Sequence, residues 1–589
     1  GEVVQGQHTR VVRMDSLPHL SGLQERRATE YRPQVPHVLD EAAVGLVTIS
    51  SEPLLTREER ETSAGSTGEE MGPLRRLFPR LCGGKRTAIS IRPAVGQEDR
   101  VHGKPLKIAV VLSGGPAAGG HNVISGLHEY LTARCEDSTL IGFVGGPKGV
   151  MTGDHIVITA SLLHRYQNLG GFDIITTGRD KIESPGQFSA ALATVTKLGL
   201  DGLVVIGGDD SNTNAAMLAE YFAQNGSKCS VVGVPKTIDG DLKNEHVEVS
   251  FGFDTATKTY AELIGNIMTD AKSSKKYYHF IRLMGRSASH IALECALVTH
   301  PTAALIGEEV AYKRKTLSQI TNLLADIVEE RAAKGIRFGV FLVPEGLIEF
   351  IPEVGSLIQE LNDLLARNIP LERIREKLSP SSQELLDFLP RRIREQLMLE
   401  RDPHGNVQVS KIETEKLLMD LVASELKARS GFQGPFNSIG HFFGYEGRCA
   451  MPSNFDCNYC TALGKTAGVL LEHKATGMMA IVRNLSGPVQ MWQPGGYPLT
   501  AMMHLERRKG KLKPVIRKAL VDLTAKPFLT FKRNRRRWTV SNDFVNPGPI
   551  QFYGPFCNTV CTTLSLEHDN DYDAGSPPPA GQAKLVAKL

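Results

Sequence analysis

The sequence predicts an α/β protein with two Rossmann-like three-layer domains, in each of which an open parallel sheet lies between layers of helices. Two observations support this fold class. Short apolar runs that end in glycine alternate with helical patterns, which is the rhythm of βαβ units. In addition, 589 residues are several times the usual length of one domain, so two or more separate cores are expected.

The first domain is expected over residues 101–275. Lys107 opens the run KIAVVLSGG, which is typical of a buried parallel strand that ends in a loop, and the following HNVISGLHEYL has a helical pattern. Similar units recur at LIGFVGGPKG, GLVVIGGDDSNTNAAMLAEYF and SVVGVPKTIDGDL. These units predict a doubly wound sheet, whose ligands bind at the carboxyl ends of its strands.

A second domain is expected from residues 276–350 together with 431–500. Its strands are predicted at YHFIRLMGR, AALIG and GVFLVPEG, and it should face the first domain across a cleft. Residues 351–430 are rich in Leu, Glu, Arg and Lys at helical spacing, which predicts a helical insertion.

The two ends of the chain carry weaker signals. Residues 1–100 mix charge, Pro and Ser-rich pieces with little periodicity, which predicts an N-terminal arm, partly disordered, with a few short helices and no chemistry. Residues 501–568 are expected to pack back on the core, and residues 569–589, with SPPPAG, are linker-like. A start at Gly1 leaves open whether the chain is a fragment of a longer fused polypeptide.

The composition limits the classes of partner. A net charge of +4 and a pI of about 8.4 suit small anionic substrates, and the basic run Lys532–Trp538 is typical of a solvated face, so no nucleic acid is expected. Nine cysteines at irregular spacing argue against a disulfide framework and favour a cytoplasmic location. No apolar run approaches the roughly 18 residues needed to span a bilayer, so no membrane association is expected.

Two glycine-rich loops follow predicted strands. The first, Ser113–Asn122 (SGGPAAGGHN), precedes a helix, where backbone N–H groups suit phosphate oxygens, although an ordinary glycine turn would look similar. It does not match the Walker A pattern. The second, Gly207–Asn214 (GGDDSNTN), places carboxylates beside two glycines. Asp209 is the candidate Mg²⁺ ligand there, and a helix N-cap is the simpler alternative.

The third loop, Pro235–Asp241 (PKTIDGD), brings one lysine and two aspartates close together. A carboxylate in such a cluster can accept the proton of an attacking hydroxyl, while the ammonium stabilises charge on a transferring phosphoryl group. A surface turn would explain this loop alone. Because all three loops end strands of one domain, together they predict a phosphotransferase that acts on a polyphosphate.

In order and spacing these loops resemble those of phosphofructokinases of the pyrophosphate-dependent kind, and the chain most resembles the catalytic beta-type subunits of the long clade. The resemblance extends from about Gln24 to GPIQFYGP and rests on the motifs GGDDSNTN, VPKTIDGDLK, KKYYHFIRLMGR, VPEGLIEFIPE, MLERDPHGNVQVSKIETEK and HFFGYEGR. It implies two Rossmann-like domains of phosphofructokinase type with the active site in the cleft. It also implies reversible phosphoryl transfer from pyrophosphate to the C1 hydroxyl of fructose 6-phosphate, in glycolysis and gluconeogenesis, with Mg²⁺ as cofactor.

The resemblance further implies roles for single residues. Those implied in catalysis are the proton acceptor Asp239, with Lys236, Asp210 and Arg286. Those implied in pyrophosphate binding are Gly114, Gly115, Arg179, Gly208 and Lys236, with Asp209 as the Mg²⁺ ligand. Those implied in sugar-phosphate binding are Thr237, Ile238, Asp239, Met284, Gly285, Arg286, Glu345, Tyr445, Glu446, Gly447 and Arg448, with Lys276 and Tyr277 from a neighbouring subunit. A homo-oligomer, or a hetero-oligomer with an alpha-type subunit or domain, is therefore expected.

The predicted donor depends on Asp210 and Lys236, where ATP-using relatives typically carry glycine. A carboxylate about 4 Å from the α-phosphate of a nucleotide would repel it by about 4 kcal/mol at an effective dielectric constant of about 20. The alternatives are an ATP-dependent phosphofructokinase, a non-catalytic alpha-type subunit, and a lipid or nicotinamide-dinucleotide kinase. The first loop departs from the more usual SGGQAPGGHN at Pro116, which removes a backbone donor and predicts an altered affinity for pyrophosphate.

Overall fold

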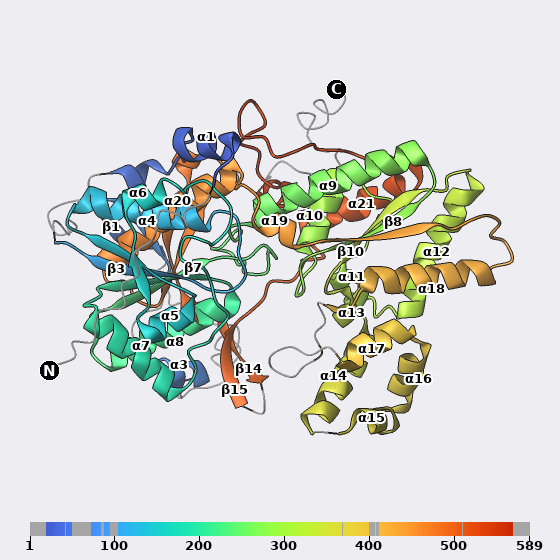
Figure 1. Ribbon diagram of the computed structural model, residues 1–589, viewed down its shortest axis with the longest axis horizontal. Coiled ribbons are helices and arrows are strands. Elements are labelled where there is room, and N and C mark those ends of the chain that lie inside the picture. The colour runs from blue at the N-terminus through green and yellow to red at the C-terminus, as the bar shows by residue number, and fades with distance from the viewer. Residues whose placement is uncertain are drawn as a thin grey trace.

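The computed structural model describes residues 19–41, 43–49, 72–83, 87–94, 104–367, 369–399, 407, 411–508 and 511–568. Within these ranges the chain forms two large sheets flanked by helices, so the predicted α/β class is confirmed (Figure 1). The Ser-rich piece at 63–67 and the linker-like tail at 569–589 lie outside the described residues.

The larger sheet has nine strands in the order β1-β2-β13-β12-β7-β6-β3-β4-β5. Their bounds are β1 Val44–Thr48, β2 Ile89–Pro93, β3 Lys107–Leu112, β4 Thr139–Phe143, β5 His155–Val157, β6 Gly202–Gly207, β7 Ser230–Pro235, β12 Met478–Arg483 and β13 Gln493–Pro498. Strands β12, β7, β6, β3 and β4 run parallel, whereas β13, β2, β1 and β5 pair antiparallel with their neighbours. Every residue of β6 and β7 is buried, as expected for central strands of a parallel sheet.

Helices cover both faces of this sheet (Figure 1). One face carries α1 Gly22–Glu30, α4 Gly120–Arg134, α6 Ala160–Leu163 and α20 Asn454–Glu472, and the other carries α3 Pro73–Leu77, α5 Pro147–Thr152, α7 Pro185–Lys197 and α8 Asp209–Gln224. Helices α4 and α20 pack so closely that a Cβ atom on Gly464 would lie 2.1 Å from the carbonyl oxygen of Val123. Glycine at this crossing therefore permits backbone contact.

Two predictions about this sheet need correction. Residues 431–500 were expected in the second domain, but α20, β12 and β13 belong to the nine-stranded sheet, because β12 pairs with β7 and α20 packs on α4. The N-terminal arm was expected to be partly disordered with a few short helices, but it also contributes β1 and β2, which extend the edge of the sheet from β13. Short edge strands carry little periodicity in the sequence, and their place depends on long-range pairing.

The smaller sheet has four parallel strands in the order β11-β8-β10-β9. Their bounds are β8 Tyr278–Leu283, β9 Ala303–Ala304, β10 Gly339–Pro344 and β11 Ser438–Phe443. Helices α9 Phe253–Ser274 and α10 His290–Thr299 pack on one face, and α12 Leu317–Ala333 and α18 Thr414–Ala428 pack on the other. Three of these strands lie where they were predicted, whereas β11 was not foreseen.

The predicted helical insertion is only partly separate from the second sheet. Helices α14 Pro352–Ala366, α15 Leu371–Lys377, α16 Pro380–Phe388 and α17 Arg391–Leu399 form a lobe beside the sheet (Figure 1). Helix α18 was assigned to the insertion, but it covers β8 and β11. Short helices α11 Gly307–Tyr312, α13 Leu347–Phe350 and α19 Tyr445–Arg448 follow strands β9, β10 and β11.

The C-terminal part of the described chain crosses from the larger sheet to the smaller one. It comprises the hairpin β14 Met503–Arg508 and β15 Lys511–Ile516, then helices α21 Lys526–Ser541 and α22 Thr562–His568. The basic run lies in α21, where Arg535 binds Glu309 at 2.6 Å and Arg536 binds Glu330 at 2.6 Å. At least part of this run therefore has acidic partners in the same chain.

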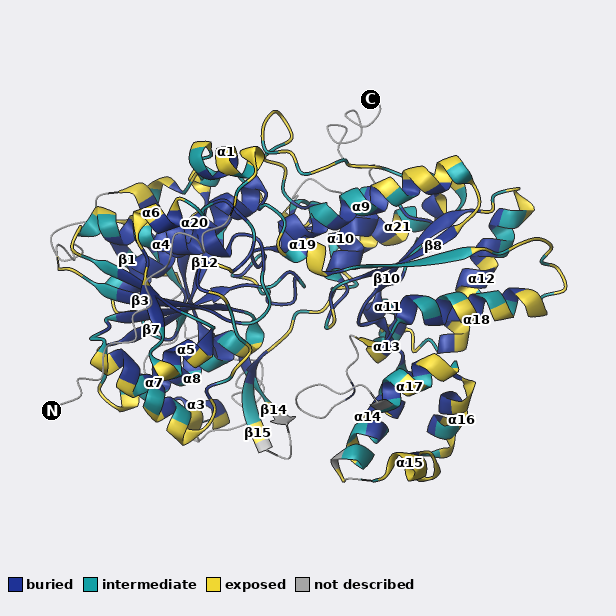
Figure 2. Ribbon diagram, in the orientation of Figure 1, coloured by how far each residue is buried: buried dark blue, intermediate teal, exposed yellow. Residues whose placement is uncertain are grey.

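Burial follows the layers. The strands of both sheets are mostly buried, and exposed residues gather on the outer faces of the helices and on the α14–α17 lobe (Figure 2). Among the helices in the described ranges, none combines the length and the apolar character needed to cross a membrane.

Candidate active site

The first loop joins β3 to α4 at the carboxyl edge of the larger sheet. Gly114 has a φ of 88°, which favours glycine, and its N–H donates to the carbonyl of Gly178 at 2.9 Å. The Thr177 hydroxyl donates to the carbonyl of Gly114 at 2.7 Å. A Cβ atom on Gly115 would lie 2.2 Å from the guanidinium of Arg448, so this position has no room for a side chain unless Arg448 moves.

The second loop is fastened to its neighbours on both sides. The Ser211 hydroxyl donates to the Ser113 hydroxyl of the first loop at 2.8 Å. The Asn212 amide donates to the carbonyls of Gly207 at 2.6 Å and Val234 at 3.3 Å, which ties the second loop to β7. The N–H of Lys236, in the third loop, donates to the carbonyl of Gly207 at 3.0 Å. The three loops thus form one connected unit.

Two aspartates begin α8 at the end of this second loop, after Gly208 as N-cap. The Asp209 side chain is 25% exposed, so its carboxylate is reachable from solvent. The Asp210 side chain is 49% exposed, and its carboxylate lies 3.1 Å from the Nζ of Lys181. Both carboxylates therefore start the helix at its positive end, where negative charge is stabilised.

Lys236 provides a buried cation in the third loop. Its residue is only 7% exposed, and its Nζ would lie 3.3 Å from a Cβ atom built on Gly114. Burial, reinforced by the neighbouring charge of Arg448, lowers the pKa of Lys236 to about 8, although Asp239 and other carboxylates oppose this shift. The Lys236 ammonium is thus directed at the first loop from within the protein.

The rest of the third loop holds two carboxylates in a tight turn. The Asp239 N–H donates to the hydroxyl of Thr237 at 3.1 Å, and Ile238 between them is buried. Asp241 is 5% exposed, and burial together with the charge of Asp239 raises the pKa of the Asp241 carboxyl. Asp239 is less buried than Asp241, which leaves it better placed to meet a substrate hydroxyl.

The second sheet contributes the opposite wall. Met284, Gly285 and Arg286 follow β8, and Glu345 follows β10. The Glu345 carboxyl is buried, and its pKa is raised to about 7, first by burial and also by the charge of Asp239. The charge of Asp239, from the third loop, therefore acts on Glu345, from the second sheet.

The segment after β11 reaches back to the first loop. Gly447 packs on the ring of Tyr260, where a Cβ atom would lie 2.5 Å from ring carbons. The Arg448 Nε donates to the carbonyl of Pro116 at 3.4 Å. Tyr445 is 69% exposed, and Glu446 is also exposed. Arg448 therefore links the two walls of the site.

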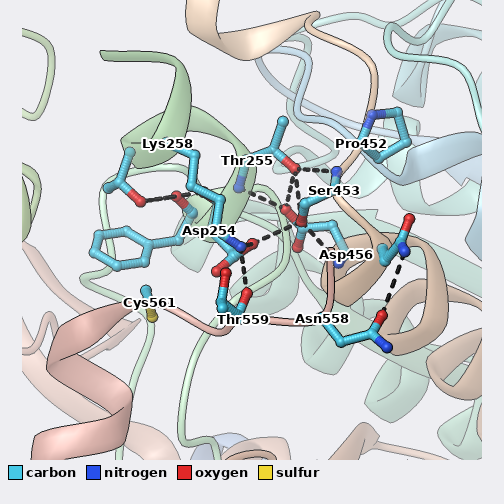
Figure 3. Close-up of polar contacts among 12 residues, drawn as sticks. Asp254, Thr255, Lys258, Pro452, Ser453, Asp456, Asn558, Thr559 and Cys561 are labelled. Atoms are coloured by element: carbon cyan, nitrogen blue, oxygen red, sulfur yellow. Dashed lines mark hydrogen bonds and ion pairs between the residues drawn. The ribbon is translucent and has the colours of Figure 1, made fainter. Parts of the chain in front are cut away.

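A buried polar network joins the starts of α9 and α20 beside the site (Figure 3). Asp456, near the start of α20, accepts hydrogen bonds from the backbone N–H groups of Gly252 at 3.0 Å and Thr255 at 2.9 Å. Ser453 donates to Asp254 at 2.6 Å. Because burial raises the pKa of the Asp456 carboxyl, its environment disfavours the charged form. The starts of α9 and α20, which follow the third loop and α19, are thereby held together.

Lys276 and Tyr277 lie away from the loops that form this cluster. Lys276 and Tyr277 are exposed and precede β8, whereas Met284 follows it, so they lie at the opposite end of the strand. At about 3.3 Å per residue, the six-residue strand separates these ends by roughly 20 Å. Arg179 is exposed beside Gly178, which itself holds the first loop.

The structure also brings in a lysine that sequence analysis did not single out. The Nζ of Lys518, from the segment after β15, lies 3.7 Å from Asp209 and 3.8 Å from Asp241. It also donates to the hydroxyl of Ser287 at 2.5 Å. No sequence pattern marks Lys518, because its neighbours here are far away along the chain.

The carboxylates suit a magnesium ion that is shared with a substrate. In the described part of the chain, no group of three or more His, Cys, Asp or Glu residues is arranged to hold a metal alone. Mg²⁺ usually binds through one or two carboxylates and completes its shell with water and substrate phosphate oxygens. Asp209 fits that requirement, since its side chain is partly open to solvent.

Fold and site together define a phosphotransferase, in which a glycine-rich loop and a carboxylate cluster lie side by side at the carboxyl edge of the larger sheet. The family model described as Phosphofructokinase matches residues 107–471, more than half of the sequence, and the chain belongs to the phosphofructokinase family.

Within this family, the chain is similar in sequence to several individual proteins. Pyrophosphate–fructose 6-phosphate 1-phosphotransferase subunit beta of Solanum tuberosum is 54% identical over 527 residues, which cover 89% of this chain and 92% of the relative. The pyrophosphate–fructose 6-phosphate 1-phosphotransferase of Treponema pallidum is 56% identical, over 78% of this chain and 83% of the relative. The subunit alpha of the Solanum tuberosum enzyme is 40% identical, over 94% of this chain and 90% of the relative.

Solved structures support the fold. The crystal structure of a pyrophosphate-dependent phosphofructokinase from Marinobacter aquaeolei matches 77% of this chain and 96% of its own, with a TM-score of 0.50 and 14% identity. At this identity the match concerns the fold alone.

Proposed function

We propose that this chain transfers a phosphoryl group reversibly from pyrophosphate to the C1 hydroxyl of fructose 6-phosphate, giving fructose 1,6-bisphosphate and phosphate in glycolysis and gluconeogenesis. The observation that carries the proposal is the buried ammonium of Lys236, directed at the first loop next to Gly114. Such a fixed cation can stabilise a small polyphosphate without a nucleotide-binding pocket. The names of the Solanum tuberosum and Treponema pallidum relatives state a pyrophosphate–fructose 6-phosphate 1-phosphotransferase.

The chemistry follows from the placement of the three loops. Gly115, Gly208 and Arg179 would bind the pyrophosphate, and Asp239 would accept the proton of the C1 hydroxyl as that oxygen attacks the nearer phosphorus. Lys236 and Arg286 would stabilise the charge on the transferring group. The bond to the second phosphate then breaks, and phosphate leaves.

The sugar phosphate would lie on the opposite wall of the site. Thr237 and Ile238 would contact it from the third loop, and Glu345, with its raised pKa, is suited to hydrogen bonding with a sugar hydroxyl. The remaining contacts would come from Met284, Gly285, Arg286, Tyr445, Glu446, Gly447 and Arg448. Arg448 also touches Pro116, so binding of the sugar phosphate and the shape of the first loop should be coupled.

Magnesium would be held by Asp209 together with phosphate oxygens of the donor. When bound, it would neutralise charge on the pyrophosphate. The chain's own contribution is to keep the Asp209 carboxylate at the positive end of α8 and partly open.

The preference for pyrophosphate over ATP would come from Asp210 and Lys236. The Asp210 carboxylate would repel a nucleotide α-phosphate, but its ion pair with Lys181 and its half-exposed position weaken that repulsion. The buried Lys236 is therefore the stronger of the two determinants.

Assembly into an oligomer would complete the sugar site. Lys276 and Tyr277 are exposed at the far end of β8, from which they could reach the site of a neighbouring subunit. That neighbour could be a second copy or an alpha-type chain. A cytoplasmic location fits the nine cysteines, all of which are free.

Phosphorus NMR tests this proposal directly. Purified protein is incubated with Mg²⁺, fructose 6-phosphate and pyrophosphate, and the reverse mixture is followed separately. Equimolar fructose 1,6-bisphosphate and phosphate in the first mixture, and pyrophosphate in the second, are expected. Hydrolysis of pyrophosphate without a sugar bisphosphate product would overturn the proposal.

A further inference from the structure

The segment that joins β15 to α21 connects both walls of the active site through its backbone. The N–H of Ala519 donates to the carbonyl of Asp241 at 2.7 Å, and its carbonyl accepts from His290 of α10 at 3.0 Å. The N–H of Val521 donates to Glu308 of α11 at 3.0 Å. Asp241 follows a strand of the larger sheet, whereas α10 and α11 accompany the smaller sheet, so the segment is held by both parts of the molecule.

This placement directs one side chain into the carboxylate cluster. The Lys518 ammonium donates to Ser287, which follows β8, and lies within 4 Å of Asp209 and Asp241, which follow β6 and β7. One cation therefore touches the metal-side carboxylate, the third loop and the sugar-side loop at once. Its side chain is 39% exposed, so it can move when a ligand arrives.

The carboxylates need such a cation. Asp241 is 5% exposed, and a buried negative charge is costly without a positive partner. Asp209 and Asp241 would also repel each other, and that repulsion would separate the second and third loops. The ammonium of Lys518 opposes both effects while the site is free of substrate.

We propose that Lys518 is a positioning residue of the phosphotransfer site, a tethered cation that takes the cation position beside Asp209 until a metal-bound donor enters. The inference rests on the proposed function, since it assumes that Asp209 meets the metal. The segment after β15 would then preorganise the carboxylates of the site. If Lys518 were only a structural brace, it would have no such effect.

A positioning cation and a structural brace predict different metal affinities once the charge of Lys518 is removed. A tethered cation repels a second cation, so Lys518→Met should bind Mn²⁺ tighter than the wild type, by about fivefold in the substrate-free enzyme. Mn²⁺ binding is measured by electron paramagnetic resonance, without turnover. In the same variant kcat should fall about 30-fold with little change in the KM for fructose 6-phosphate, and Lys518→Arg should recover much of it.

Two further variants make the result specific. Lys518→Gln keeps a hydrogen bond to Ser287 but loses the charge, so it should also bind Mn²⁺ more tightly. Lys513→Met is the matched control, because Lys513 lies in β15, just before the segment that holds Lys518, and pairs with exposed Glu183 at 3.2 Å. It should change neither Mn²⁺ affinity nor kcat.

Unchanged or weaker Mn²⁺ binding in both Lys518→Met and Lys518→Gln would overturn the proposal, as would normal turnover in both. Failure of the proposed function would look different. In that case the wild type itself would show no turnover with pyrophosphate, whatever the Mn²⁺ affinities of the variants.

Discussion

The two walls of the active site are built in different ways. On the wall formed by the larger sheet, hydrogen bonds such as Ser211 to Ser113 lock the loops together, and Lys236 is 7% exposed. On the wall formed by the smaller sheet, Arg286 is exposed and Tyr445 is 69% exposed. The difference indicates that the larger-sheet wall, called the anion wall below, is fixed within one chain, whereas we propose that the wall on the sugar side is completed by substrate and by a neighbouring subunit.

The largest effect is expected from Asp239→Ala, which removes the proposed proton acceptor in the third loop. We expect kcat to fall by about a thousandfold, because general-base catalysis is lost, while fructose 6-phosphate still binds through its other contacts. Steady-state kinetics and calorimetric titration of fructose 6-phosphate measure the two quantities. Near-normal turnover would remove Asp239 from its role.

The second-largest effect is expected from a change confined to the anion wall. Replacing both Asp210 and Lys236 by Gly should lower kcat/KM for pyrophosphate by about a hundredfold, since the buried cation is lost, and should admit some ATP. The KM for fructose 6-phosphate serves as the internal control and should change little. Unaltered pyrophosphate kinetics would show that the donor preference has another source.

Gly115→Ala tests the link between the walls. The added Cβ atom would lie 2.2 Å from the Arg448 guanidinium, so Arg448 must move, and we expect the KM for fructose 6-phosphate to rise about tenfold. Gly186→Ala is the matched control, because a Cβ atom there meets no heavy atom within 4 Å. Equal kinetics for the two variants would contradict the linking role of Arg448.

The smallest expected effect is a pH dependence of kcat/KM for pyrophosphate that originates in the anion wall. Lys236 carries its charge below its lowered pKa of about 8 and loses it above, so kcat/KM for pyrophosphate should fall about fivefold between pH 8 and 9. Lys236→Arg keeps its charge throughout this range and should flatten the alkaline limb. An alkaline limb that persists in Lys236→Arg would assign it to another group.

Features of the two walls that follow from a local pattern could be predicted from the sequence, whereas features that depend on distant segments could not. The three loops of the anion wall each follow a mostly apolar strand, so their strand-end positions could be recognised from local pattern, as for β6 before Asp209. Strands β1, β2 and β11 and the role of α20 were missed or misassigned because they depend on pairing between distant segments. Lys518 was missed for the same reason, since only the fold brings it to Asp241.

Residue roles implied by resemblance stay predictions where no contact tests them. Pro116 illustrates this, because its carbonyl accepts from Arg448 and its ring removes one N–H from the first loop, but the consequence for pyrophosphate affinity requires measurement. The comparison of Pro116→Gln with the wild type would supply it.

The most direct test of the account is the initial rate with Mg²⁺ and fructose 6-phosphate, with pyrophosphate and ATP compared as donors at matched concentrations. A prebuilt anion wall with a buried Lys236 predicts turnover with pyrophosphate and little or none with ATP. Turnover with ATP alone would contradict the donor assignment while leaving the fold and the family intact.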